Sequence, residues 1–294
     1  MGVGDDFKRF CDALRIPQAT RSTISSRTAQ ITKRLNQDFW NSQSEQEHSF
    51  YSGSYGRGTG IKGISDIDLL MQLPYETYQQ YNDYKGNGQS ALLQAVKNSI
   101  LKTYSSTTLK GDGQVVVVSF NDMTYEVLPV FLNTDGSYTF PDSNNNGSWK
   151  QTKPKEEMAE VEKRNSETNG NLRELCRIAR SWKACNNVSM SGMLVDTLAY
   201  NFIGSCQNKD KSYLYYDYIS RDFFEFLKNQ NSNQSYWIAP GSGQYVYASG
   251  NFTYKAGQAH RASLEAIQYA NNNNTWSARQ KWREIYGTDY PSSD

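Results

Sequence analysis

A short apolar segment with two aspartates limits what this chain can fold into more than any other feature. Residues 66–73 read DIDLLMQL and are followed by Pro74, a pattern typical of a buried β-strand that stops at a proline. Side chains two residues apart in a strand point to the same face, so Asp66 and Asp68 should lie together. Two like charges beside apolar neighbours are costly unless a cation or a proton neutralises them. The segment therefore predicts a functional site on a β-sheet.

A third acid, Glu126, lies in another β-rich segment, TYEVLPVFL at 124–132. The run VVVVSF at 115–120 precedes it across a short polar turn, which predicts a β-hairpin. If the strand of Glu126 neighbours the strand of Asp66 and Asp68, three carboxylates converge on one patch of sheet. Such oxygen ligands, supplemented by substrate phosphates, suit Mg²⁺. Two such ions can activate an attacking hydroxyl and stabilise a leaving pyrophosphate.

The glycine-rich stretch GSYGRGTGIKG at 53–63 precedes the aspartate strand. The backbone N–H groups of Gly53 and Ser54 and the Ser54 hydroxyl can hold phosphate oxygens, and small residues let the backbone approach closely. The stretch before Asp66 is long enough for a short helical turn. The sequence contains no Walker A motif, and no dinucleotide-binding fingerprint surrounds these residues.

The order of the remaining elements predicts an α+β fold with two lobes. Helical periodicity covers residues 22–40, and residues 90–104 read as a helix that Ser90 can cap. From about residue 155 helical patterns dominate, interrupted by loop or strand character at 237–247. We therefore predict a mixed α/β lobe at 1–154, which includes an N-terminal helix, and a helical lobe at 155–294.

The motif series resembles the polymerase-β-like nucleotidyltransferases, and within them the bacterial relatives of cyclic GMP-AMP synthase, the CD-NTases of CBASS antiphage defence. The resemblance is carried by GSYGRGTGIKGISDIDLL, EVLPVF, WKQTKPK at 149–155 and RIARSWK at 177–183, and WIAPGSG and WREIYG extend it toward the C-terminus. It implies a mixed-sheet catalytic lobe packed on a helical lobe, with an N-terminal spine helix. It also implies an enzyme that makes a cyclic di- or trinucleotide from NTPs and releases pyrophosphate, and whose product activates an effector protein.

Site residues follow from the same resemblance, position by position. Asp66, Asp68 and Glu126 would be the catalytic residues and would bind two Mg²⁺ ions, for which Mn²⁺ can substitute. Gly53, Ser54, Lys183 and Ser191 would bind the nucleotide triphosphate. Two positions depart from the family pattern: the third acid is often Asp, and animal relatives carry an aromatic residue where Gly192 stands. Arg180 is the alternative to Lys183 as the phosphate contact, and Ser191 can equally be a helix N-cap.

Composition limits the other function classes. The net charge is +1, and four scattered cysteines without CxxC spacing and only two histidines do not form the pattern of a zinc module. With no basic surface signal, a double-stranded-DNA activator is not expected. No apolar run approaches the length of a transmembrane helix, and cysteine usage fits a reducing, cytoplasmic compartment. The alternatives are a linear nucleotidyltransferase acting on RNA, protein or a small molecule, and a nucleotide-binding pseudoenzyme.

Overall fold

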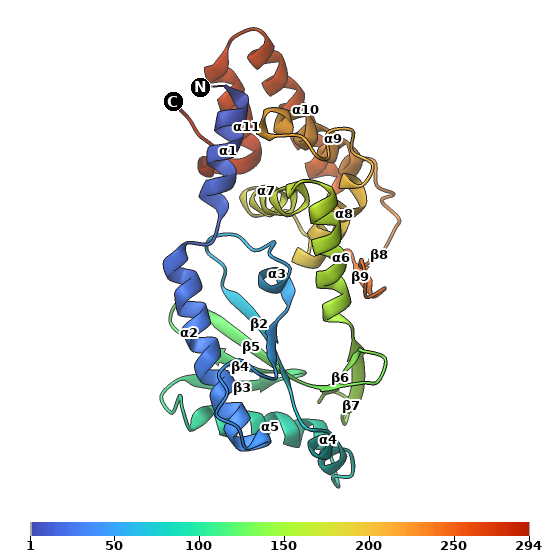
Figure 1. Ribbon diagram of the computed structural model, residues 1–294. Coiled ribbons are helices and arrows are strands. Elements are labelled where there is room, and N and C mark those ends of the chain that lie inside the picture. Colours follow the sequence, from blue (N-terminus) through green and yellow to red (C-terminus); the bar gives the residue numbers. More distant parts are fainter. Residues whose placement is uncertain (1, 294) are drawn as a thin grey trace. The chain divides into compact units, whose positions relative to one another are not determined.

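The chain divides into two compact units in the computed structural model, which describes residues 2–293 (Figure 1). The sheet unit comprises residues 16–57 and 63–155, and the helical unit comprises residues 2–15, 58–62 and 156–293. This division differs from the predicted lobes at 1–154 and 155–294, because two early segments of the chain belong to the helical unit.

A mixed sheet forms the centre of the sheet unit. Its strands follow the order β1-β2-β5-β4-β3, and β6 and β7 extend it from β5. The pair β2–β5 is parallel, and all the other pairs are antiparallel, including the predicted hairpin β4–β5. The strand bounds are β1 (Ser49–Tyr51), β2 (Asp66–Gln72), β3 (Thr108–Asp112), β4 (Val115–Ser119), β5 (Thr124–Leu132), β6 (Tyr138–Asp142) and β7 (Ser148–Thr152).

Helices α2 (Gln18–Leu35) and α5 (Gly88–Leu101) cover one face of this sheet and enclose its main core (Figure 1). A π-helical turn extends α2 to Trp40, so the predicted helix at 22–40 is confirmed and begins one turn earlier. The predicted cap of α5 is wrong. The Asn87 side chain, not Ser90, caps the helix, and it does so by accepting a hydrogen bond from the Ser90 N–H at 2.8 Å. The short helices α3 (Gly53–Gly56) and α4 (Tyr75–Asn82) complete the unit.

The two-residue period of β2 separates its apolar side chains from its acidic ones. Ile67, Leu69 and Met71 are fully buried in the core beneath α2 and α5. Asp66 and Asp68 alternate with them, so both carboxylates project from the opposite face. The predicted strand and the shared face of its two aspartates are therefore confirmed.

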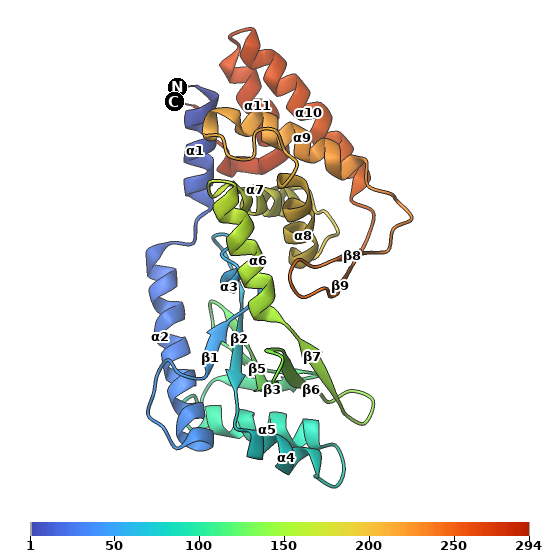
Figure 2. The same ribbon diagram turned by 45° about the vertical axis from the view of Figure 1, so that its right-hand side comes forward.

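The helical unit is built around a core rich in aromatic side chains. Its helices are α1 (Val3–Leu14), α6 (Pro154–Glu167), α7 (Asn171–Cys185), α8 (Gly192–Ile203), α9 (Tyr216–Lys228), α10 (Thr253–Asn271) and α11 (Thr275–Tyr286), and a small hairpin joins β8 (Tyr236–Ile238) to β9 (Tyr245–Tyr247). Helix α10 packs against both α9 and α11, and the three helices lie together at the top of Figure 2. Within residues 2–293 we find no helix with the length and hydrophobicity that crossing a membrane requires.

Helix α1 belongs to the helical unit because its apolar face completes that core. Phe7, Phe10 and Leu14 are fully buried there, and the Phe7 ring meets the Trp282 ring edge-on with 5.0 Å between centroids. Burial of three large apolar side chains stabilises this arrangement by several kcal/mol, roughly 1.5–3 for each. This long-range packing explains why the N-terminal residues do not join the sheet unit.

Candidate active site

Three carboxylates share one face of the sheet where β2 and β5 run parallel. Asp68 and Glu126 are register partners across the two strands, and Asp66 lies two residues before Asp68. Because neighbouring strands are about 4.8 Å apart, side chains paired in this way on one face are close neighbours. Asp66 is exposed, whereas Asp68 and Glu126 are half-buried. The sequence predicted that three carboxylates converge if these two strands are neighbours, and the structure shows that they are.

The electrostatics of this face favour a cation. Burial raises the pKa of Asp68, and the Asp66 carboxylate raises it further, although the Arg57 guanidinium opposes both effects. Burial also raises the pKa of Glu126, and Asp68, Asp66 and Asp112 add to the increase. Both pKa values are raised because the ionised carboxylates repel one another and lack solvation. A bound divalent cation would relieve both costs.

The chemistry of the donors fits Mg²⁺, but the ligands are not preassembled around a metal position. Within residues 2–293, no three His, Cys, Asp or Glu side chains lie in an arrangement that could hold a metal ion as they stand. Carboxylate oxygens on one sheet face are nevertheless the hard ligands that Mg²⁺ takes, and this ion commonly draws its other ligands from water and substrate phosphates.

Two further residues, which the sequence interpretation did not assign to the site, orient the aspartates. The Ser65 hydroxyl donates a hydrogen bond of 2.8 Å to Oδ2 of Asp66. The backbone N–H of Ser52 donates to the Asp68 carbonyl at 2.9 Å, which fixes the start of α3 against β2. Nothing in the sequence pattern could have singled out these contacts, because both depend on how the loops return to the strand.

Gly53 lies directly against the Asp68 carboxylate. Its φ is +57°, and a Cβ at this position would stand 1.7 Å from Oδ2 of Asp68. An L-residue side chain is disfavoured in this backbone conformation, and here there is also no space for one. The glycine is thus required for α3 to approach the acid. The predicted contact of Gly53 and Ser54 with phosphate stays a prediction.

We expect Gly53→Ala to reduce turnover by on the order of 100-fold, since the new methyl group must displace the Asp68 carboxylate by an ångström or more. The same change should cost only about 1–2 kcal/mol of folding free energy, because the carboxylate is the free end of a side chain. Pyrophosphate release and urea unfolding measure the two quantities. Gly63→Ala is the matched control: its φ is also positive, but a Cβ there meets nothing. Equal losses of turnover in both variants would contradict this role of Gly53.

In the helical unit, Lys183 and Arg180 occupy different environments on α7. Nη2 of Arg180 donates to Oδ2 of Asp196 at 2.7 Å and to the Gly192 carbonyl at 3.0 Å, so this arginine holds the start of α8. A Cβ at Gly192 would come within 2.5 Å of the same guanidinium, which explains glycine in place of an aromatic residue. Lys183 is half-exposed and makes no hydrogen bond or ion pair with any described residue. Of the two, Lys183 is therefore the one free to bind an anion.

Ser191 is the N-cap of α8. Its Oγ accepts a hydrogen bond from the backbone N–H of Leu194 at 3.0 Å. The helix N-cap role, which the sequence offered as an alternative for Ser191, is thus present in the structure. A capping hydroxyl retains a proton that it can donate, so the predicted phosphate contact is compatible with the cap and stays a prediction.

Comparison with known proteins decides the family. The model of the SMODS domain, the Second Messenger Oligonucleotide or Dinucleotide Synthetase domain, matches residues 1–165, which is more than half of the chain. The chain belongs to the SMODS family. It is a nucleotidyltransferase of the CD-NTase class, which makes cyclic oligonucleotide second messengers in antiphage defence, as the motif series implied. No curated protein matches the sequence.

Solved structures resemble this SMODS protein over most of its length. The Escherichia coli MS115-1 CdnC:HORMA-deltaN complex matches with a TM-score of 0.70 and 13% identity, over 98% of both chains. GTP-bound Vibrio cholerae DncV gives 0.62 and 14%, over 83% of this chain and 68% of that one. The Capnocytophaga granulosa CdnE c-di-GMP synthase gives 0.61 and 18%, over 85% and 81%. These likenesses confirm the predicted α+β nucleotidyltransferase fold.

Proposed function

We propose that Asp66, Asp68 and Glu126 are the catalytic centre of this SMODS enzyme and that they act with two Mg²⁺ ions, for which Mn²⁺ can substitute. The observation that carries the proposal is the register that pairs Asp68 with Glu126 and places all three acids on one sheet face. When bound, the two ions would lower the pKa of the attacking hydroxyl and neutralise charge on the triphosphate.

The reaction is transfer of a nucleotidyl group between two NTPs. A ribose hydroxyl of one nucleotide attacks the α-phosphorus of the other, the bond between the α-phosphorus and its bridging oxygen breaks, and pyrophosphate leaves. The hydroxyl proton passes to water. We assign Asp66 and Asp68 to both ions and Glu126 to the side of the attacking hydroxyl. A second transfer within the linear product, or after a further addition, closes the ring.

The substrates and setting are part of the proposal. ATP, GTP or a pyrimidine NTP would enter the site, and the cyclic product would activate a separate effector protein in the cytoplasm, where NTPs are abundant. The net charge of +1 gives no support for a nucleic-acid activator, since such binding relies on clustered Lys and Arg.

Incubation of the purified protein with each pair of labelled NTPs and Mg²⁺ or Mn²⁺ tests the proposal. A product that resists phosphatase but is cleaved by a nuclease is the expected result, because a ring has no terminal phosphate. A phosphatase-sensitive product would indicate a linear nucleotidyltransferase instead. Absence of pyrophosphate release with every pair and both ions, in protein that binds NTP, would indicate a pseudoenzyme.

We further propose that Lys183 binds the donor triphosphate together with Ser191, Gly53 and Ser54. Lys183→Ala should weaken NTP binding by roughly 1.5–3 kcal/mol, the range for a hydrogen bond to a charged group. Turnover should recover at high NTP concentration. Calorimetric titration measures the affinity, and Lys8→Ala, on exposed α1 surface, is the control that should leave it unchanged. Unchanged affinity in Lys183→Ala would remove this residue from the site.

A further inference from the structure

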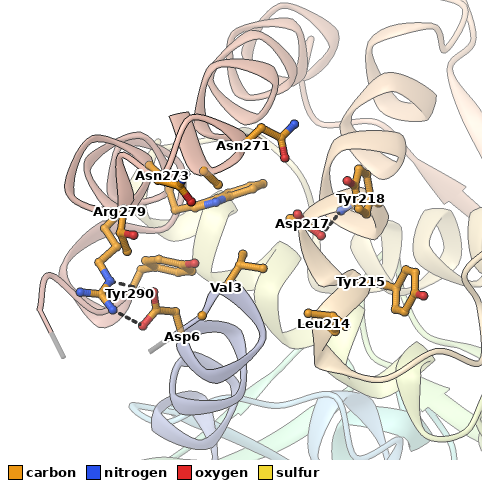
Figure 3. A pocket seen from close by; sticks show the side chains of 15 residues that line it. Val3, Asp6, Leu214, Tyr215, Asp217, Tyr218, Asn271, Asn273, Arg279 and Tyr290 are labelled. Carbon is orange, nitrogen blue, oxygen red and sulfur yellow. Dashed lines mark hydrogen bonds and ion pairs between the residues drawn. The ribbon is translucent and has the colours of Figure 1, made fainter. Parts of the chain in front are cut away.

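The helical unit contains a pocket of about 470 Å³ that none of the residues assigned above lines. It lies among the first turn of α1, the start of α9 and the turn that joins α10 to α11 (Figure 3). All the residues around it belong to the helical unit. Its volume suits a small organic molecule, since ligand pockets commonly begin at about 300 Å³.

A buried carboxylate faces this pocket without a cationic partner. Asp217 is 5% exposed, and in Figure 3 its side chain projects from α9 toward the centre of the pocket. It accepts a hydrogen bond from the backbone N–H of Tyr218 at 2.8 Å and forms no ion pair with any of residues 2–293. The Arg221 guanidinium on the same helix pairs with Asp222 instead, at 2.7 Å. Burial raises the pKa of Asp217 to about 6, although the Tyr218 hydrogen bond and the Arg221 charge act in the opposite direction, so above that pH the carboxylate is ionised without a direct ion-pair partner.

The second acid of the pocket is neutralised. Asp6 on α1 receives two hydrogen bonds from Arg279 on α11, at 2.7 and 3.0 Å, and both side chains are almost completely buried. This bidentate pair leaves no free positive charge for an anionic ligand. Nη1 of Arg9 also lies 4.0 Å from Oδ1 of Asp6. Of the two acids that line the pocket, Asp217 is therefore the one without a direct ion-pair partner among the described residues.

Two hydrogen-bond donors complete the lining. The indole N–H of Trp282 is buried and has no hydrogen-bond partner in the described part of the chain. The hydroxyl of Tyr290 points into the pocket from the side opposite Asp217 (Figure 3), and it too makes no hydrogen bond with a described residue. Burial raises the pKa of Tyr290, and the charges of Asp6 and Asp217 contribute, so the hydroxyl stays protonated and able to donate. A buried donor without a partner is costly, so the Trp282 indole favours a ligand that offers an acceptor oxygen, and the Tyr290 hydroxyl can donate to the same ligand.

We propose that this pocket binds a small organic amine whose ammonium group pairs with Asp217 and whose hydroxyl or carbonyl oxygen accepts a hydrogen bond from Trp282 or Tyr290. The Arg221 guanidinium already lies over the Tyr218 ring, 4.9 Å from its centroid. The rings of Trp282 and Tyr290 suit the apolar body of such a molecule and can stabilise a nearby cation. A nucleotide does not fit this chemistry, because its phosphates would meet the charge of Asp217. The proposal does not depend on the catalytic assignment above.

Three probes that share one phenol ring and differ in the charge of the tail test this inference: tyramine, tyrosol and 4-hydroxyphenylacetate. Titration calorimetry at pH 7.5 on the full chain should show tyramine binding roughly tenfold or more tighter than tyrosol, the factor expected for one charged hydrogen bond. 4-Hydroxyphenylacetate should bind most weakly. The same order is expected with Asp66→Asn/Asp68→Asn protein, so failure of the catalytic proposal would not affect the result.

Variants decide whether the pocket is responsible. Asp217→Asn keeps the shape of the side chain and should abolish the preference for tyramine over tyrosol, whereas Glu225→Gln, an exposed position on the same helix, should preserve it. Asn271→Trp fills the pocket from its exposed rim without removing a core contact and should block tyramine. Thermal unfolding checks that each variant is folded. Equal binding of tyramine and tyrosol by the parent protein, or tyramine binding that survives both Asp217→Asn and Asn271→Trp, would overturn the inference.

Discussion

Replacing Asp66 and Asp68 together by asparagine is expected to abolish nucleotide incorporation while the protein stays folded. The two carboxylates share one face of β2 and are the ligands we assign to both ions, so the variant loses the charge that holds Mg²⁺ and the triphosphate. Pyrophosphate release with excess NTP and Mg²⁺ or Mn²⁺ measures the loss. Undiminished release would end the proposal of metal catalysis at this face.

Stability distinguishes this result from simple unfolding. In the metal-free protein the pKa of Asp68 is raised by burial and by Asp66, so the native state disfavours the ionised form. Asp68 therefore keeps its proton to higher pH in the native state than in the unfolded chain, and the free energy of unfolding falls as pH rises above about 4. The double variant lacks this penalty. Its melting temperature at neutral pH should therefore equal or exceed that of the parent without metal.

The second large effect is expected for Glu126→Gln, which keeps size and shape but removes the charge. Glu126 lies on β5, a separate strand from the aspartate pair, and we assign it to the side of the attacking hydroxyl. Donor NTP with Mg²⁺ should still bind, because Asp66 and Asp68 remain. Bond formation should fall to background. Calorimetry measures the first quantity and pyrophosphate release the second.

Glu126→Asp is the matched variant. It retains the charge and shortens the reach by one methylene group, so partial turnover is expected, with a higher rate in Mn²⁺ than in Mg²⁺. Loss of both binding and turnover in Glu126→Gln would show that the acid supports the donor site or the fold. Full turnover in Glu126→Gln would remove it from catalysis.

Local patterns explain what the sequence could predict. The alternation in DIDLLMQL defines strand β2 and its acidic face, and the apolar spacing after residue 22 defines α2. The hairpin β4–β5 follows from two β-rich runs across a short turn. The order of the motifs along the chain was enough to predict the nucleotidyltransferase family, because it can be recognised without knowing the three-dimensional structure.

Non-local contacts explain what the sequence could not predict. Parallel pairing of β2 with β5 joins segments about fifty residues apart, so the neighbourhood of Asp68 and Glu126 could be stated only as a condition. The same holds for Gly53, whose requirement arises from the approach of α3 to Asp68 rather than from the turn alone. The Asp217 pocket combines the first and last helices of the chain, and no periodicity signals that meeting.

The way the chain passes between its two units limits how this protein can be recombined. The backbone leaves one unit for the other after residues 15, 57, 62 and 155, so neither unit is a continuous stretch of sequence. A chimera made by one crossover near residue 155 would combine the α1 of one parent with the α11 of another. Phe7 and Asp6 would then face a foreign Trp282 and Arg279. We expect a functional chimera of two relatives to require that α1 and the C-terminal helices come from the same parent. These segments, distant in sequence, must therefore be exchanged together.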